Sequence, residues 1–154
     1  MNLLTSLLED RLAILGTGVS VWARYSEVIS WAARDRATKS EYVPAITELE
    51  EFWNLRNDLR RLELGWVPTS EDISGFVALS DWIPTDDIFG DRGFAMFGTV
   101  VKTVRGFDAQ VGEMFPTMQV LAVDPDFKWI RDRGAFFALL EPSPVLFGDL
   151  AGLM

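Results

Sequence analysis

Glycine and proline are distributed very unevenly along this chain of 154 residues. Ten of the twelve glycines and six of the seven prolines lie after residue 64, whereas residues 1–64 carry frequent i, i+3, i+4 apolar repeats. Glycine and proline interrupt helices and are typical of turns. We therefore expect a helical first part, residues 1–64, and a mixed, mainly β second part, residues 65–154. The length predicts a single domain over residues 1–154.

The first part is expected to form three helices, over about residues 3–15, 19–38 and 44–64. The first should end at Gly16, because glycine commonly terminates helices. The third should begin near Pro44, since proline suits the first helical turn. Two apolar rows, one containing Trp53 and the other Leu55 and Leu59, predict a wide apolar face on this third helix, with apolar surface left over.

The second part is expected to begin with a short helix from Thr69 to about residue 79, because residues 69–72 resemble a capping box. A loop over residues 81–93 should follow. Three strands are then predicted, over about residues 94–104, 115–123 and 129–140, with a turn at 124–126. The expected fold class is α+β: three N-terminal helices and a short fourth helix packed on a three-stranded antiparallel sheet. An apolar tail, residues 144–154, should dock on its own domain.

Composition removes several classes of function. The chain has no histidine and no cysteine, which excludes Ser-His-Asp triads, thiolate zinc sites and disulfides. With 14 basic and 23 acidic residues, its net charge of −9 argues against direct nucleic-acid binding. No apolar stretch is long enough to cross a membrane, and the N-terminal residues do not resemble a secretory signal. We expect a cytoplasmic protein without a cofactor, and we assign no catalytic residue.

Residues 70–91 contain six acidic side chains and no basic one. Such a segment can be a solvated loop, a docking surface for a basic partner, or a site for a divalent cation. Tryptophan is common at interfaces, so two tryptophans are candidate anchors. Trp31 lies off the apolar stripe of Trp22, Tyr25 and Ile29 on the second predicted helix, and Trp82 borders the aspartate-rich loop. The partner-binding surface is predicted to comprise Glu71, Asp72, Asp81, Trp82, Asp86, Asp87, Asp91 and Trp31.

Residues 97–140 resemble a small uncharacterised bacterial domain that is common in alphaproteobacteria and their mobile elements. The matching positions are Gly98, Val100, Thr117, Val120, Asp124, Pro125, Trp129, Arg131, Phe137 and Leu139. Asp132, Gly134 and Ala135 depart from the pattern of that domain. The resemblance implies the three strands and a bacterial or phage origin, and it implies no activity.

The leading functional hypothesis is a small, acidic, non-enzymatic protein that binds the basic surface of another protein, as inhibitors, immunity proteins and phage counter-defence proteins do. One alternative is a metal-dependent hydrolase that uses the aspartate-rich loop. Another is a structural protein that forms homo-oligomers through surplus apolar helix surface and its tail.

Overall fold

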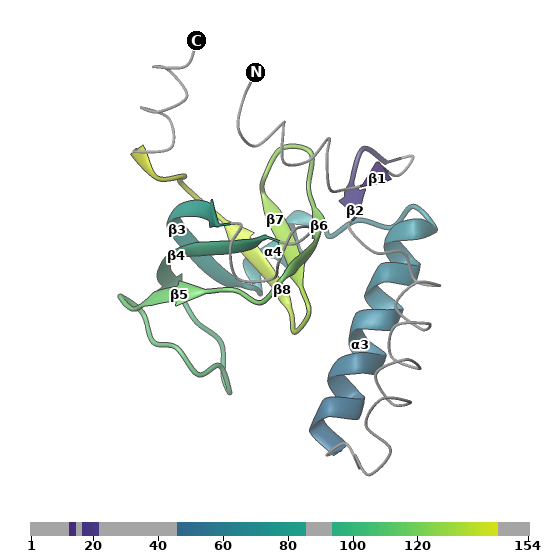
Figure 1. Ribbon diagram of the computed structural model, residues 1–154, viewed down its shortest axis with the longest axis horizontal. Helices are drawn as coiled ribbons and strands as arrows, with labels where there is room; N and C mark the ends of the chain where they lie inside the picture. The colour runs from purple at the N-terminus through teal and green to yellow at the C-terminus, as the bar shows by residue number, and fades with distance from the viewer. Residues whose placement is uncertain (1–12, 15–16, 22–45, 86–93, 145–154) are drawn as a thin grey trace.

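A computed structural model describes residues 13–14, 17–21, 46–85 and 94–144, and in these ranges the chain forms two helices and one sheet of eight strands (Figure 1). The helices are α3 (Ile46–Glu63) and α4 (Ser70–Ser74). The strands are β1 (Ala13–Ile14), β2 (Ser20–Val21), β3 (Val77–Thr85), β4 (Ala95–Lys102), β5 (Met114–Pro116), β6 (Val120–Val123), β7 (Trp129–Asp132) and β8 (Phe136–Leu139).

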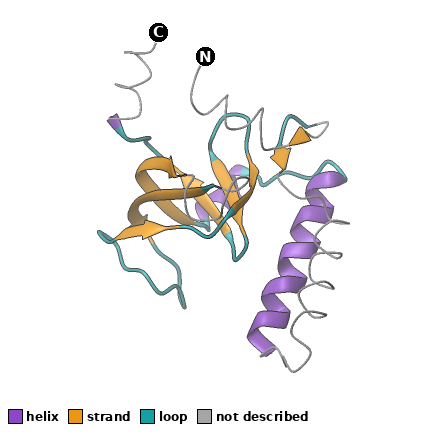
Figure 2. Ribbon diagram, in the orientation of Figure 1, coloured by secondary structure: helices purple, strands orange, loops and turns teal. Residues whose placement is uncertain are grey.

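The expected α+β architecture is wrong, because the described chain is mainly β sheet (Figure 2). Of the three expected N-terminal helices, only the third is present in the described residues, as α3. Residues 13–14 and 20–21 of the other two lie in short antiparallel strands, joined by a turn in which Gly18 has φ +82°. The remaining parts of those two predicted helices, and most of the predicted apolar tail, lie outside the described residues.

The sheet contains more strands than the three expected. Strand β3 begins inside the predicted short helix, since Gly75 ends α4 after one turn. Residues 77–79 are all buried, and a continuous apolar run of this kind does not distinguish helix from strand. The predicted strands 115–123 and 129–140 each form two strands. The first is interrupted at residues 117–119 and the second at residues 133–135.

Two antiparallel meanders, β3-β4-β5 and β6-β7-β8, make up most of the sheet. They join along a parallel pair, β3 with β8, in the order β1-β2-β6-β7-β8-β3-β4-β5. If this sheet were flat, β5 and β6 would lie about 24 Å apart. The connection of residues 117–119 spans at most about 14 Å. The sheet must therefore curl, and Val120 N–H accordingly donates to the Phe94 carbonyl oxygen at 2.8 Å.

A hydrophobic core lies on each side of the curled sheet. The first fills the inside of the curl, with Leu79, Met96, Ile130 and Phe137 among its buried members. The second lies between α3 and the β2-β6-β7 part of the sheet, where Figure 1 shows α3 beside the β1-β2 hairpin. The second core consists of Val19, Val21, Leu55, Leu59, Leu62, Leu121, Ala122 and Trp129.

Helix α3 buries one of the two expected apolar rows, and the tryptophan of the other row is exposed. Leu55 and Leu59 of the predicted second row are buried in the core against the sheet. Trp53 of the other row is 51% exposed, with the Arg56 guanidinium 4.5 Å from the centroid of its ring system. The helix is therefore fixed by one row of leucines and presents an aromatic and basic outer surface.

Candidate functional site

The structure describes four of the eight residues of the predicted partner-binding surface: Glu71, Asp72, Asp81 and Trp82. The other four, Asp86, Asp87, Asp91 and Trp31, lie outside the described residues. Glu71 is exposed on α4, and Asp81 is exposed on β3. Asp81 lies four positions after Val77, where β3 begins, which corresponds to about 13 Å of extended chain. The described carboxylates are thus spread along one strand and the helix before it.

Asp72 has a structural partner in the cap of α4. Its Oδ2 accepts a hydrogen bond from Thr69 N–H at 2.9 Å, and Asp72 N–H donates to Thr69 Oγ1 at 3.1 Å. This is the predicted capping box, which is therefore confirmed. The hydrogen bond from the Thr69 backbone is the main cause that lowers the pKa of Asp72 below its ordinary value. Asp72 is exposed, but its carboxylate is already engaged by its own helix.

The expectation that Trp82 is an exposed anchor is wrong. Its side chain is 3% exposed and belongs to the core inside the curl, where it stacks on Phe127 with ring centroids 5.9 Å apart. Its Nε1–H donates to the Leu140 carbonyl oxygen at 3.3 Å. Trp82 thus fixes the segment after β8 to strand β3. In the sequence Trp82 follows a charged residue, which suggested that it is exposed. The register shift between Ser80 and Ile83 places Trp82 inward instead, and the sequence does not indicate this shift.

That register shift turns Asp81 toward solvent. Asp81 has φ +55°, in the left-handed region that asparagine and aspartate adopt more readily than most residues. Its N–H donates to the Glu141 carbonyl oxygen at 2.7 Å, so the exposed residues Asp81 and Glu141 lie on adjacent chain segments. Leu140, next to Glu141, is 52% exposed. A bulge that re-aims a side chain is common beside functional sites.

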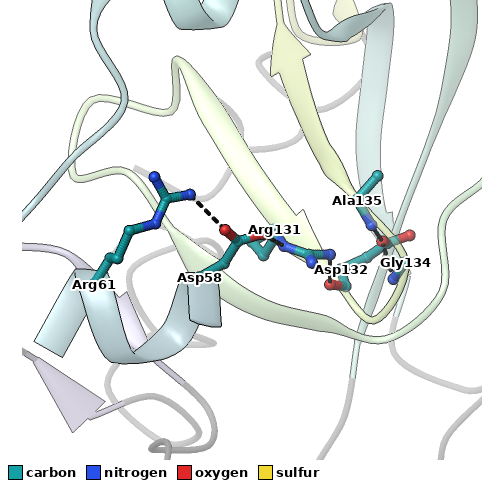
Figure 3. Close-up of polar contacts among 6 residues, drawn as sticks. All are labelled: Asp58, Arg61, Arg131, Asp132, Gly134 and Ala135. Atoms are coloured by element: carbon teal, nitrogen blue, oxygen red, sulfur yellow. Dashed lines mark hydrogen bonds and ion pairs between the residues drawn. The ribbon is translucent and has the colours of Figure 1, made fainter. Parts of the chain in front are cut away.

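A second polar cluster, which the sequence did not predict, connects α3 with β7 (Figure 3). Arg131 is 1% exposed, and its Nε donates to Asp58 Oδ2 at 3.0 Å. Its Nη1 donates to the Asp132 carbonyl oxygen at 2.8 Å. The other oxygen of Asp58 accepts from Arg61, so one carboxylate is shared by two guanidinium groups. Burial lowers the pKa of Arg131, and the nearby Asp58 opposes that effect.

The carboxylate of Asp132 lies at the turn between β7 and β8. Its Oδ1 accepts from the N–H groups of Gly134 and Ala135, each at 2.7 Å, and its Oδ2 accepts from Met118 N–H at 3.0 Å. Burial raises the pKa of Asp132 above its ordinary value, against the effect of these hydrogen bonds and of Arg131. Asp132 therefore closes the turn and joins it to the β5-β6 connection.

An open groove runs between α3 and the β7-β8 turn. Its lining residues are Asn54, Asn57, Asp58, Arg60, Arg61, Leu64, Arg131, Gly134 and Ala135. Arg61 is also held by Trp66, since its guanidinium lies 3.9 Å from the centroid of the Trp66 rings. One sequence signal did point here, because the two-residue period of a strand places Arg131 on the same buried face as Trp129.

The described residues contain no group of three or more acidic side chains placed to hold a metal ion. Within the same residues, no helix combines the length and the apolar character needed to cross a membrane. No protein-family model, no curated protein and no solved structure matches this chain. The resemblance of residues 97–140 to the bacterial domain stays a prediction.

Proposed function

We propose that this protein is a non-enzymatic binding protein, and that the exposed carboxylates of Asp81 and Glu141 engage a basic surface of another protein. The observation that carries the proposal is the bulge in β3, where a residue with φ +55° directs a carboxylate to solvent. Such a backbone conformation costs about 1 kcal/mol or more and is found disproportionately at functional sites.

The surroundings of Asp81 support the same surface. The segment after β8 is held rigidly beside β3, because Ser143 N–H donates to the Trp82 carbonyl oxygen at 2.8 Å and Leu140 N–H donates to that of Leu79 at 2.9 Å. Leu140 adds an exposed apolar contact next to the two carboxylates. Protein interfaces generally combine an apolar contact with charges that select the partner and accelerate association. Asp86, Asp87 and Asp91 follow β3 in the sequence and lie outside the described residues, so the proposal does not rest on them.

Comparative affinity capture tests the proposal. The tagged wild-type protein and two double variants would be exposed to lysate of the source cell, at low and at high salt. Asp81→Asn with Glu141→Gln removes two charges from the proposed surface. Asp108→Asn with Asp126→Asn removes two charges from exposed positions elsewhere and is the matched control.

The proposal predicts one stoichiometric partner that the wild type and the control variant retain at low salt. The Asp81/Glu141 variant should lose it, and high salt should weaken its retention. Retention of the same partner by all three proteins would contradict this surface. A partner lost equally by both variants would indicate only a general attraction to negative charge.

Self-association is a second candidate, favoured by a specific feature of the sheet. The exposed side chains Val101 on β4 and Met114 on β5 lie on one face, since Met114 pairs with Thr99 in the ladder. Strand β5 is the last strand of the described sheet, and such an edge can pair with another chain. Light scattering at high concentration should then give a mass above 17.3 kDa that Met114→Glu reduces. A monomer would contradict this candidate.

A further inference from the structure

The groove between α3 and the β7-β8 turn is basic, although the chain as a whole carries a net charge of −9. Three arginines and one aspartate line it, and the aspartate, Asp58, is shared by Arg61 and Arg131. The nearby carboxylate of Asp132 accepts from backbone N–H groups of the turn and of Met118. We propose that this groove binds an extended acidic peptide segment of a partner protein.

Two of the three arginines, Arg60 and Arg61, are exposed on α3 and can contact a ligand, whereas Arg131 is buried. Arg61 is held between Asp58 and the face of Trp66, so it loses little freedom when a ligand binds. Arg60 is the neighbouring residue in the last turn of α3, and it is exposed. The planar fork of a guanidinium matches a carboxylate through two parallel hydrogen bonds. Two adjacent arginines therefore favour a ligand with more than one carboxylate.

The length of the groove favours a peptide over a small anion. Its lining on α3 extends from Asn54 to Leu64, which corresponds to about 15 Å along a helix. An extended chain rises about 3.3 Å per residue, so four or five residues span this distance. The amides of Asn54 and Asn57 can hydrogen-bond to a peptide backbone. Leu64 is 78% exposed at the far end and offers an apolar contact.

The inferred ligand is thus a segment of four or five residues with at least two carboxylates and an apolar residue at one end. This inference does not rest on the proposed function, because the groove and the Asp81 surface have opposite charge. The groove is built from α3 and the β7-β8 turn, whereas Asp81 and Glu141 lie on β3 and the segment after β8. Either surface can fail its test while the other passes.

Fluorescence anisotropy of a labelled five-residue peptide tests the inference on the full chain. The probe has four acidic residues followed by leucine, and a peptide with the corresponding amides is its neutral control. Arg60→Gln with Arg61→Gln removes two charges from the groove. Lys102→Gln with Arg105→Gln removes two charges from exposed positions on β4 and beyond it, and serves as the matched control variant.

We expect the acidic peptide to bind the wild type saturably, and the neutral peptide to bind at least about tenfold more weakly. The Arg60/Arg61 variant should lose about tenfold in affinity, whereas the Lys102/Arg105 variant should lose less than about twofold. Leu64→Glu at an exposed position leaves the Asp58 contacts intact and should weaken binding more than Leu64→Gln does. This second pair of variants keeps the test decisive if the double arginine variant unfolds.

Four outcomes would overturn the inference. The first is equal binding of the acidic and the neutral peptide. The second is an equal loss of affinity in the groove variant and in its matched control. The third is displacement of the peptide by inorganic phosphate at equal concentration, which would show that the groove takes a small anion. Absence of saturable binding up to about 1 mM peptide would also overturn it, because such a site contributes less than about 4 kcal/mol.

Discussion

Arg131 on β7 and Asp58 on α3 are 73 residues apart in the sequence, yet Nε of the arginine donates to Oδ2 of the aspartate at 3.0 Å. The arginine is almost fully buried, so its charge depends on this carboxylate and on the Asp132 carbonyl oxygen for compensation. The pair connects the helix to the sheet at the edge of the second core. It therefore fixes the position of α3 against the sheet and, with it, the shape of the groove.

Removing the negative charge of this pair should destabilise the fold. Asp58→Asn leaves the buried Arg131 guanidinium without its ion partner, and the free energy of unfolding should fall by about 3 kcal/mol. Urea unfolding measures the change. Glu50→Gln, at an exposed position of the same helix, is the control and should change stability by less than about 0.5 kcal/mol. Equal losses in the two variants would show that the pair has no special role.

Asp132 should make stability fall as the pH rises through part of the acidic range. Burial raises its pKa, so the folded protein holds this proton to a higher pH than the unfolded chain, whose ordinary value is 3.8. Its contribution to the free energy of unfolding is greatest below 3.8 and decreases as the pH rises through the raised pKa. The stability of the wild type minus that of Asp132→Asn should therefore decrease with pH in this window.

Asp72 provides the opposite comparison. Its pKa is lowered by the hydrogen bond from the Thr69 backbone, so its contribution to stability is present above 3.8 and is lost as the pH falls. The stability of the wild type minus that of Asp72→Asn should therefore increase with pH. Urea unfolding at several pH values between about 3 and 7 measures both trends. Trends of the same sign would contradict the assignment of the two carboxyl groups.

The left-handed backbone of Asp81 predicts an unusual order of stability among its variants. Asp81→Gly should be as stable as the wild type or more so, because glycine adopts φ +55° without strain. Asp81→Ala should be about 1 kcal/mol less stable than Asp81→Gly, because a Cβ is crowded in this conformation. Thermal unfolding gives the order. If alanine is tolerated as well as glycine, the bulge is not fixed by the surrounding structure.

Gly98 on β4 should not tolerate a side chain. A Cβ at this position would lie 3.1 Å from the Ser80 carbonyl oxygen and 3.2 Å from Trp82 Cβ. Gly98→Ala should therefore destabilise the protein by about 1–3 kcal/mol through overpacking. In Gly134→Ala the nearest atom is 3.6 Å away, an ordinary contact, so this variant is the control. Similar unfolding midpoints for both variants would show that β3 and β4 separate without cost.

Local signals in the sequence predicted the elements that depend on local interactions. The leucine row of α3, the capping box at Thr69 and the turn at 124–126 were all found. The number of strands was underestimated because several strands have only two to four residues, and because residues 120–123 of β6 are buried on both faces. The parallel pairing of Val77 with Phe137 joins segments far apart in the chain, and no local pattern indicates such a pair.

Of the predicted site residues that the structure describes, the sequence correctly indicated the exposure of the charged ones. Asp81 and Glu71 are exposed as expected, whereas the neighbouring Trp82 is turned into the core by the register shift in β3. The sequence does not indicate the basic groove, because its lining residues come from α3 and from β7 with the turn after it, which lie far apart in the chain. One sequence signal for the groove was Arg131, an arginine at a position that the two-residue strand period places on a buried face.

Site-specific photocrosslinking in the source cell tests the proposed acidic surface most directly. A photoreactive residue replaces Glu141, beside Asp81, and in a control protein it replaces Asp126 at an exposed turn. We expect one dominant crosslinked protein with a basic surface from position 141, and we expect it to be absent from position 126. The same products from both positions, or none from position 141, would contradict it.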